Sequence, residues 1–105
     1  MKRREVIFSA GAEQDFINIL DWLTPVAGGN IALSYVLRIR ENCLTYDVGS
    51  ERGTLRNDVL PNLRISGFEK RVTFAFIVSE EKVEFLRIFY GGRNWEGDFD
   101  DREKT

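Results

Sequence analysis

Two runs of β-branched and aromatic residues, joined by a short polar turn, constrain the fold of this chain more than any other feature. Residues 71–78 read RVTFAFIV, residues 83–90 read VEFLRIFY, and the intervening residues 79–82 read SEEK. Residues of these types favour strands, and the short polar link predicts an antiparallel pair. The run at 72–78 is almost continuously apolar, which indicates a central strand covered on both faces.

Two amphipathic helices are predicted before these strands. Residues 6–8 form a short apolar run that predicts a strand, and Ser9 is suited to cap the helix that follows. Apolar residues recur at helical spacing from 12 to 23, and Pro25 is expected to end the helix, because proline disfavours a helical residue before it. A second apolar stripe runs from Ala32 to Tyr46, after the turn at Gly28-Gly29. We therefore expect an antiparallel helical hairpin.

The remaining segments complete an α+β pattern. Residues 49–61 are rich in turn-forming residues and are expected to be a loop, followed by a short strand at 63–65 and a turn or bulge at 67–68. Trp95 and Phe99 are four residues apart and predict one amphipathic turn. We expect one domain over residues 1–105, with an N-terminal strand, an antiparallel helical hairpin, a three-stranded antiparallel meander and a short C-terminal helical turn.

Charge and cysteine content narrow the class of protein. Fifteen Lys and Arg face 17 Asp and Glu, a net charge of −2, which argues against nucleic acid as the main partner because each phosphate contact needs a cation. The single cysteine, Cys43, lies on an apolar stripe and is expected to be buried; it allows no internal disulfide. No apolar run reaches membrane-spanning length, so we expect a cytoplasmic protein. The sequence suggests no metal or cofactor site.

Several short motifs follow one another along the chain. They are Arg56-Asn57-Asp58, Pro61-Asn62-Leu63-Arg64, Gly67-Phe68 with Lys70-Arg71, and the segment IFYGGRN at 88–94. This ordered set resembles the RelE/ParE toxin superfamily, and its ParE branch in particular. The chain departs from the usual family pattern at Ala10, where proline is frequent, at Tyr90, where histidine is frequent, and at Asn94, where aspartate is common.

The resemblance implies a function as well as a fold. It implies a bacterial toxin of a type II toxin–antitoxin system, of the plasmid-stabilising kind, that inhibits DNA gyrase without catalysis. It also implies a cognate antitoxin, ParD-like with a ribbon-helix-helix start, that neutralises the toxin in a hetero-oligomer. DNA would be contacted only through the antitoxin or gyrase. Two alternatives stay open: a RelE-like ribosome-dependent mRNA endoribonuclease, and a non-toxic member that only binds its antitoxin.

Candidate site residues follow from the same comparison. The candidates for target binding are Arg64, Lys70, Arg71, Arg93 and Trp95. The plainer interpretation is a charged strand edge and, for Trp95, a cap on the end of the core.

The long loop supplies a second group of candidates, Arg52, Arg56 and Asp58, with a plain exposed connection as the alternative. Cleavage of RNA would draw on Arg71, Arg87, Tyr90 and Arg93, yet the chain contains no histidine. We therefore interpret Arg87 and Tyr90 as ordinary strand residues and assign no catalytic residue.

Overall fold

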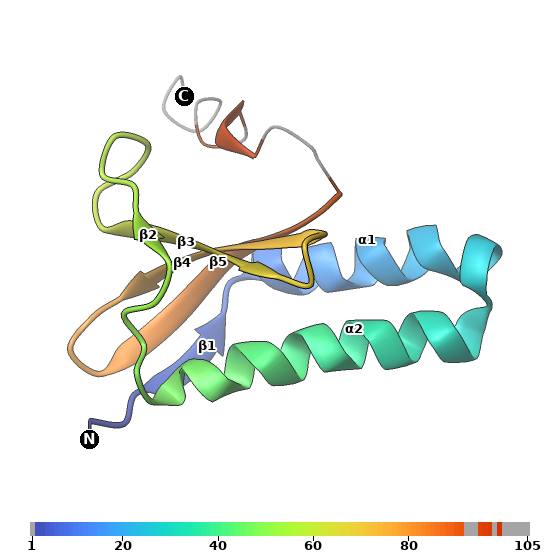
Figure 1. The fold of residues 1–105 in the computed structure, drawn as a ribbon, viewed down its shortest axis with the longest axis horizontal. Helices are drawn as coiled ribbons and strands as arrows, with labels where there is room; N and C mark the ends of the chain where they lie inside the picture. Colours follow the sequence, from blue (N-terminus) through green and yellow to red (C-terminus); the bar gives the residue numbers. More distant parts are fainter. Residues whose placement is uncertain (1, 92–94, 98, 100–105) are drawn as a thin grey trace.

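The protein is a mixed sheet with a helical hairpin against one face (Figure 1). A computed structural model describes residues 2–91, 95–97 and 99. The elements in chain order are β1 (Glu5–Phe8), α1 (Ala10–Ala27), α2 (Gly29–Leu44), the 3-10 helix η1 (Thr45–Asp47), β2 (Thr54–Leu55), β3 (Leu63–Phe68), β4 (Val72–Val78) and β5 (Lys82–Tyr90). The predicted fold class and the order of its main elements are confirmed.

The sheet has the strand order β1-β5-β4-β3-β2 and is larger than the predicted meander. Strands β3, β4 and β5 are antiparallel as expected, whereas β1 pairs with β5 in parallel, from Glu5 opposite Lys82 to Phe8 opposite Phe85. The turn or bulge expected at 67–68 is wrong. Both residues stay in β3, paired with β4, and the reversal follows at 69–70, where both residues have positive φ.

Helix α1 begins as predicted and ends later than predicted. The Ser9 hydroxyl accepts a hydrogen bond from the Ala12 N–H at 3.1 Å, which confirms the cap. The expected end at Pro25 is wrong, since the helix runs to Ala27. Proline removes only one backbone hydrogen bond, in an exposed last turn where water can replace it. Gly28, with φ of 90°, ends α1 and is the one residue between the helices.

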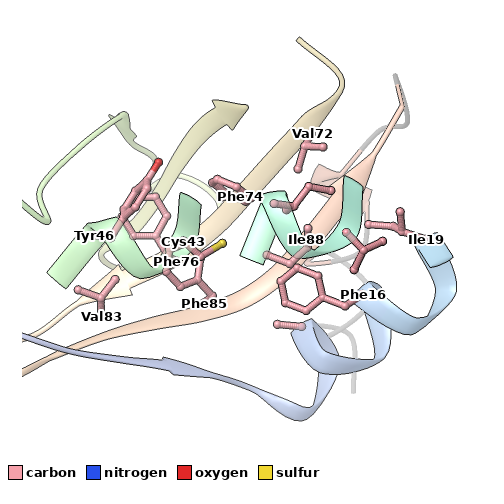
Figure 2. Close-up of a cluster of buried hydrophobic side chains, with 13 residues drawn as sticks. Phe16, Ile19, Cys43, Tyr46, Val72, Phe74, Phe76, Val83, Phe85 and Ile88 are labelled. Carbon is pink, nitrogen blue, oxygen red and sulfur yellow. The ribbon is translucent and has the colours of Figure 1, made fainter. Parts of the chain in front are cut away.

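The main core lies between the sheet and the hairpin (Figure 2). Phe74, Phe76 and Phe85 are fully buried there, and the Tyr46 ring meets the last two edge-on at centroid distances of 5.2 and 5.3 Å. Cys43 is buried in the same cluster, as predicted, and burial raises the pKa of its thiol to about 12. This packing fixes α2 against the centre of the sheet.

A second, smaller apolar cluster covers the opposite face of the sheet. It contains Val59, Leu63, Ala75, Phe89 and Phe99. Strand β4 is therefore covered on both faces, which confirms the interpretation of its continuous apolar run. The described part of the C-terminal segment contains a helical turn on this side of the sheet (Figure 1).

The segment expected to be a loop carries the two-residue strand β2 at the sheet edge, so that expectation is wrong at 54–55. Gly53 precedes this strand with φ of 73°, and a Cβ there would lie 2.1 Å from the Ile65 carbonyl oxygen. Only glycine fits such a close approach of two backbones, and this contact fixes the position of β2.

No helix in the described part of the chain is long and apolar enough to cross a bilayer.

Candidate functional site

A hollow of about 360 Å³ lies where β5 ends beside α1. Helix α1 contributes one wall, the end of β5 contributes another, and Arg71 stands at the start of β4. The apolar side chains Ile19 and Ile88 line it too, and in Figure 2 they lie at one end of the main core. The hollow is thus an opening at the edge of that core.

An ion pair between Asp15 and Arg87 forms one wall of the hollow. The Arg87 Nε donates to Asp15 Oδ2 at 2.8 Å and its Nη2 donates to Oδ1 at 3.0 Å. The Ile88 N–H donates to Asp15 Oδ2 at 2.7 Å, and Asp15 is only 7% exposed. Both carboxylate oxygens are therefore engaged, and the pair ties β5 to α1.

Sequence reasoning missed Asp15 as a structural centre of this site. Asp15 lies three residues after Ala12 and four before Ile19, so it falls within the buried stripe of α1. An acid inside an apolar stripe signals a buried partner, because an unpaired buried charge is costly. That spacing was the available signal, although it names no partner.

The aromatic side chains of Trp22 and Tyr90 also line the hollow. The Trp22 indole, on α1, packs on the Tyr90 ring at a centroid distance of 5.2 Å, and Trp22 remains 60% exposed. Tyr35 of α2 meets Tyr90 edge-on at 6.0 Å. Burial raises the pKa of the Tyr35 phenol above its ordinary value, and Tyr90 adds to the rise. Tyr90 packs on the core, in agreement with its interpretation as a strand residue.

Arg71 supplies an exposed cation at the same place. Its carbonyl accepts from the Gly91 N–H at 2.7 Å, which holds its backbone against the end of β5. Its guanidinium forms no hydrogen bond or ion pair with the described residues. The neighbouring Lys70, in the β3–β4 turn, is also exposed.

The other candidates for target binding lie elsewhere. Arg64 is 18% exposed in its side chain, lies 3.5 Å from Glu51, and lines a separate hollow beside β2. Trp95 packs edge-on against Phe99 at 6.2 Å, in the cluster on the opposite face of the sheet. Arg93 and Asn94 lie outside the described residues. The structure therefore does not unite the predicted set into one surface.

The first loop candidate, Arg52, forms hydrogen bonds with the backbone that follows α2. Its Nη2 donates to the carbonyl oxygens of Thr45 and Val48 at 2.6 and 2.9 Å, and its guanidinium stacks 4.1 Å above the Tyr46 ring. These contacts give Arg52 a structural role.

The second pair of loop candidates, Arg56 and Asp58, braces the C-terminal segment. Arg56 donates to Asp58 at 2.7 and 2.9 Å and to Glu96 at 3.3 Å, and it lies 5.2 Å above the Trp95 ring. The hydrogen bond from Arg56 lowers the pKa of Asp58. The loop and the C-terminal turn are therefore held together.

The hollow contains groups suited to binding an anion. A fork-shaped guanidinium beside two aromatic rings suits an anion with an apolar body. For Asp15 to act as a base, the three hydrogen bonds that its carboxylate accepts would first have to break. Among the described residues, no three His, Cys, Asp or Glu side chains are grouped to hold a metal ion.

Comparison with known proteins rests on structure, since no family model and no curated protein matches the sequence. A solved chain from the chromosomal ParDE toxin–antitoxin system of P. aeruginosa superposes with a TM-score of 0.75. The match covers 86% of this chain and 98% of that chain, at 22% sequence identity. The chain has a ParE-like fold.

Proposed function

We propose that this protein is the toxin of a bacterial type II toxin–antitoxin system, acting in the cytoplasm on DNA gyrase and silenced by an antitoxin. The observation that carries the proposal is the structural match to a chain of a ParDE toxin–antitoxin system, which covers 98% of that chain. The ordered motifs in the sequence support the same assignment from a separate line of reasoning.

The geometry favours a toxin that acts by binding. A poison that stabilises a complex between an enzyme and DNA needs rigid surfaces and no acid or base of its own. The sheet and hairpin supply such surfaces, with Arg71 and Trp22 exposed on them.

A second candidate, ribosome-dependent RNA cleavage, has one observation in its favour. Arg71, Arg87 and Tyr90 line the same hollow, as cleavage would require. Against it, Arg87 is committed to Asp15 and the chain has no histidine. The carboxylate of the lining, Asp15, accepts three hydrogen bonds and is therefore not available as a base for the 2′-hydroxyl.

The antitoxin is proposed to cover the outer side of the hairpin. Leu33, Leu37 and Leu44 recur at helical spacing on α2 and are 47–49% exposed, and Ile17 of α1 is 51% exposed. Apolar side chains in such a row suit the apolar face of a partner helix. Saturating antitoxin should raise the melting temperature by mass action, and Leu37→Lys should reduce that rise. An unchanged melting temperature in the wild type would contradict this surface.

The decisive assay is supercoiling by purified gyrase with added toxin. We expect slower supercoiling and linear DNA after denaturation, and we expect filamentation when the protein is induced alone in bacteria. Arg71→Ala should weaken both effects, whereas Arg3→Ala, a change at a site 78% exposed and remote from the hollow, should not. Folded toxin that neither slows supercoiling nor yields cleaved DNA across several bacterial gyrases would exclude the gyrase target.

Primer extension on a translated message tests the second candidate. We expect no cuts, even on programmed ribosomes. Reproducible cuts in the ribosomal A site would replace the gyrase proposal with the endonuclease.

A further inference from the structure

We propose that the hollow between α1 and β5 binds a short acidic peptide segment of a partner protein. Arg71 would hold a carboxylate of the segment, and Trp22 and Tyr90 would pack on the neighbouring aliphatic side chain. The identity of the partner that carries the segment rests on the proposed function. The site itself is inferred from the contacts described below.

Within the described part of the chain, Arg71 differs from the other arginines in that its side chain forms no hydrogen bond or ion pair. Every other arginine among residues 2–91 forms an ion pair or donates to a main-chain carbonyl. The side chain of Arg71 does neither within the described part of the chain, and it is exposed. A guanidinium matches a carboxylate with two parallel hydrogen bonds, so its fork is available to an external acid.

The charges around the hollow favour an anion, although the protein as a whole carries a net charge of −2. The carboxylate of Asp15 is balanced by Arg87 at 2.8 Å, which leaves Arg71 as the unbalanced charge of the lining. Lys70 adds a second exposed cation in the adjoining turn. The site is therefore locally positive on an acidic protein, and it attracts an acidic segment to one place.

The apolar wall calls for an aliphatic neighbour to that acid. Ile19 and Ile88 line the hollow together with Trp22 and Tyr90. The rings of Trp22 and Tyr90 pack on each other at 5.2 Å with a tilt of 56°, so no planar group fits between them. A branched side chain packed on the outer faces of the rings would cover the apolar surface that Trp22 leaves 60% exposed.

The same features disfavour a nucleic acid strand. A strand is held by a series of cations along its backbone and by bases stacked on successive rings. Among the described residues, the lining offers Arg71 and the paired Arg87, with Lys70 in the adjoining turn. The volume of about 360 Å³ lies at the lower end of the range for ligand pockets, roughly 300–1,000 Å³. One or two side chains fill such a volume.

The test uses the full chain with Trp95→Phe, which leaves Trp22 as the only tryptophan. A phage-displayed library of random dodecapeptides is panned on this protein, and the enriched peptides are synthesised and titrated against Trp22 fluorescence. We expect Asp or Glu beside Leu, Ile or Val in the enriched peptides, and a shift of Trp22 emission on binding.

Variants of the protein distinguish peptide binding at this site from non-specific binding. Arg71→Ala should weaken peptide binding by about tenfold or more, as expected for a charge-assisted pair, and Arg71→Lys should weaken it less. Arg3→Ala is the matched control and should bind like the parent, since it removes an equal charge far from the hollow. Circular dichroism confirms that each variant is folded.

Three results would overturn the proposal: no acidic consensus in the enriched peptides, equal binding by folded Arg71→Ala, or binding of an oligothymidylate that depends on Arg71 and exceeds that of the peptides. The titration contains neither gyrase nor antitoxin. Failure of the gyrase assay therefore leaves this result untouched, and failure of the titration leaves the toxin assignment in place.

Discussion

Replacement of Asp15 by asparagine tests the ion pair that joins α1 to β5. Asparagine keeps the size of the side chain and one acceptor for the Ile88 N–H. It removes the charge and turns an amide N–H₂ group, or a weaker acceptor, toward the Arg87 guanidinium. The substitution therefore isolates the charge from the shape of the site.

The size of the effect follows from burial. Removing one partner of a buried pair costs about 3–5 kcal/mol. The Asp15 side chain is 9% exposed but that of Arg87 is 29% exposed. Water can therefore hydrate the Arg87 guanidinium in part when its partner is removed, which reduces the cost. We expect Asp15→Asn to lower the free energy of unfolding by about 2–3 kcal/mol, out of a total of about 5–15 kcal/mol for small proteins. The melting temperature should fall by on the order of 10–20 °C.

Urea unfolding of a double-mutant cycle measures the pair itself. Arg87 makes a further contact besides this pair, so Arg87→Met alone mixes two effects, whereas the cycle with Asp15→Asn removes the second. We expect a coupling energy of about 2 kcal/mol. A loss below about 0.5 kcal/mol in Asp15→Asn, with coupling near zero, would refute the argument that this pair is buried and stabilising.

Three further predictions concern other sites. Gly53→Ala should lower the free energy of unfolding by about 2 kcal/mol or more in urea unfolding, because a Cβ there meets backbone at 2.1 Å and φ is 73°; wild-type stability would contradict the close approach. Cys43, with a pKa of about 12, should resist Ellman's reagent at about pH 8 until the protein is unfolded, and fast native labelling would contradict its burial. The pKa of Asp58 is lowered by Arg56, so their contact stabilises the fold above the unfolded-state pKa of about 3.9 and is lost as the pH falls through the native pKa. NMR titration should show the pKa of Asp58 rising in Arg56→Ala.

Local patterns in the sequence were sufficient to predict the features of the fold that depend on residues close together in the chain. The β4–β5 pair follows from two apolar runs around a polar turn, and the start of α1 follows from the side chain of Ser9. The end of α1 did not follow from Pro25. The deciding residue there is Gly28, whose positive φ stops the helix two residues after a tolerated proline.

The features of the fold that depend on residues far apart in the chain could not be predicted from the sequence. Nothing in residues 5–8 specifies that they pair in parallel with β5 rather than with another strand. Arg71 was a candidate from the motifs, but its place beside Trp22 in the lining of the hollow depends on the topology. The two residues are 49 positions apart, so no local spacing in the sequence predicts that they lie together. Asp15 and Arg87 likewise meet across 72 positions.

The parallel pairing of β1 with β5 has a consequence for how the chain reaches this structure. Glu5 lies opposite Lys82, so the first strand has no sheet partner until the last strand is available. Contacts so far apart in sequence carry a large loop-closure cost and slow the search for the native state. During synthesis, the N-terminal strand must wait for β5 to leave the ribosome. A chain interrupted before β5 would lack one of the two neighbours of β4, the sheet partner of β1 and one wall of the hollow at once, so no intact part of the hollow would remain.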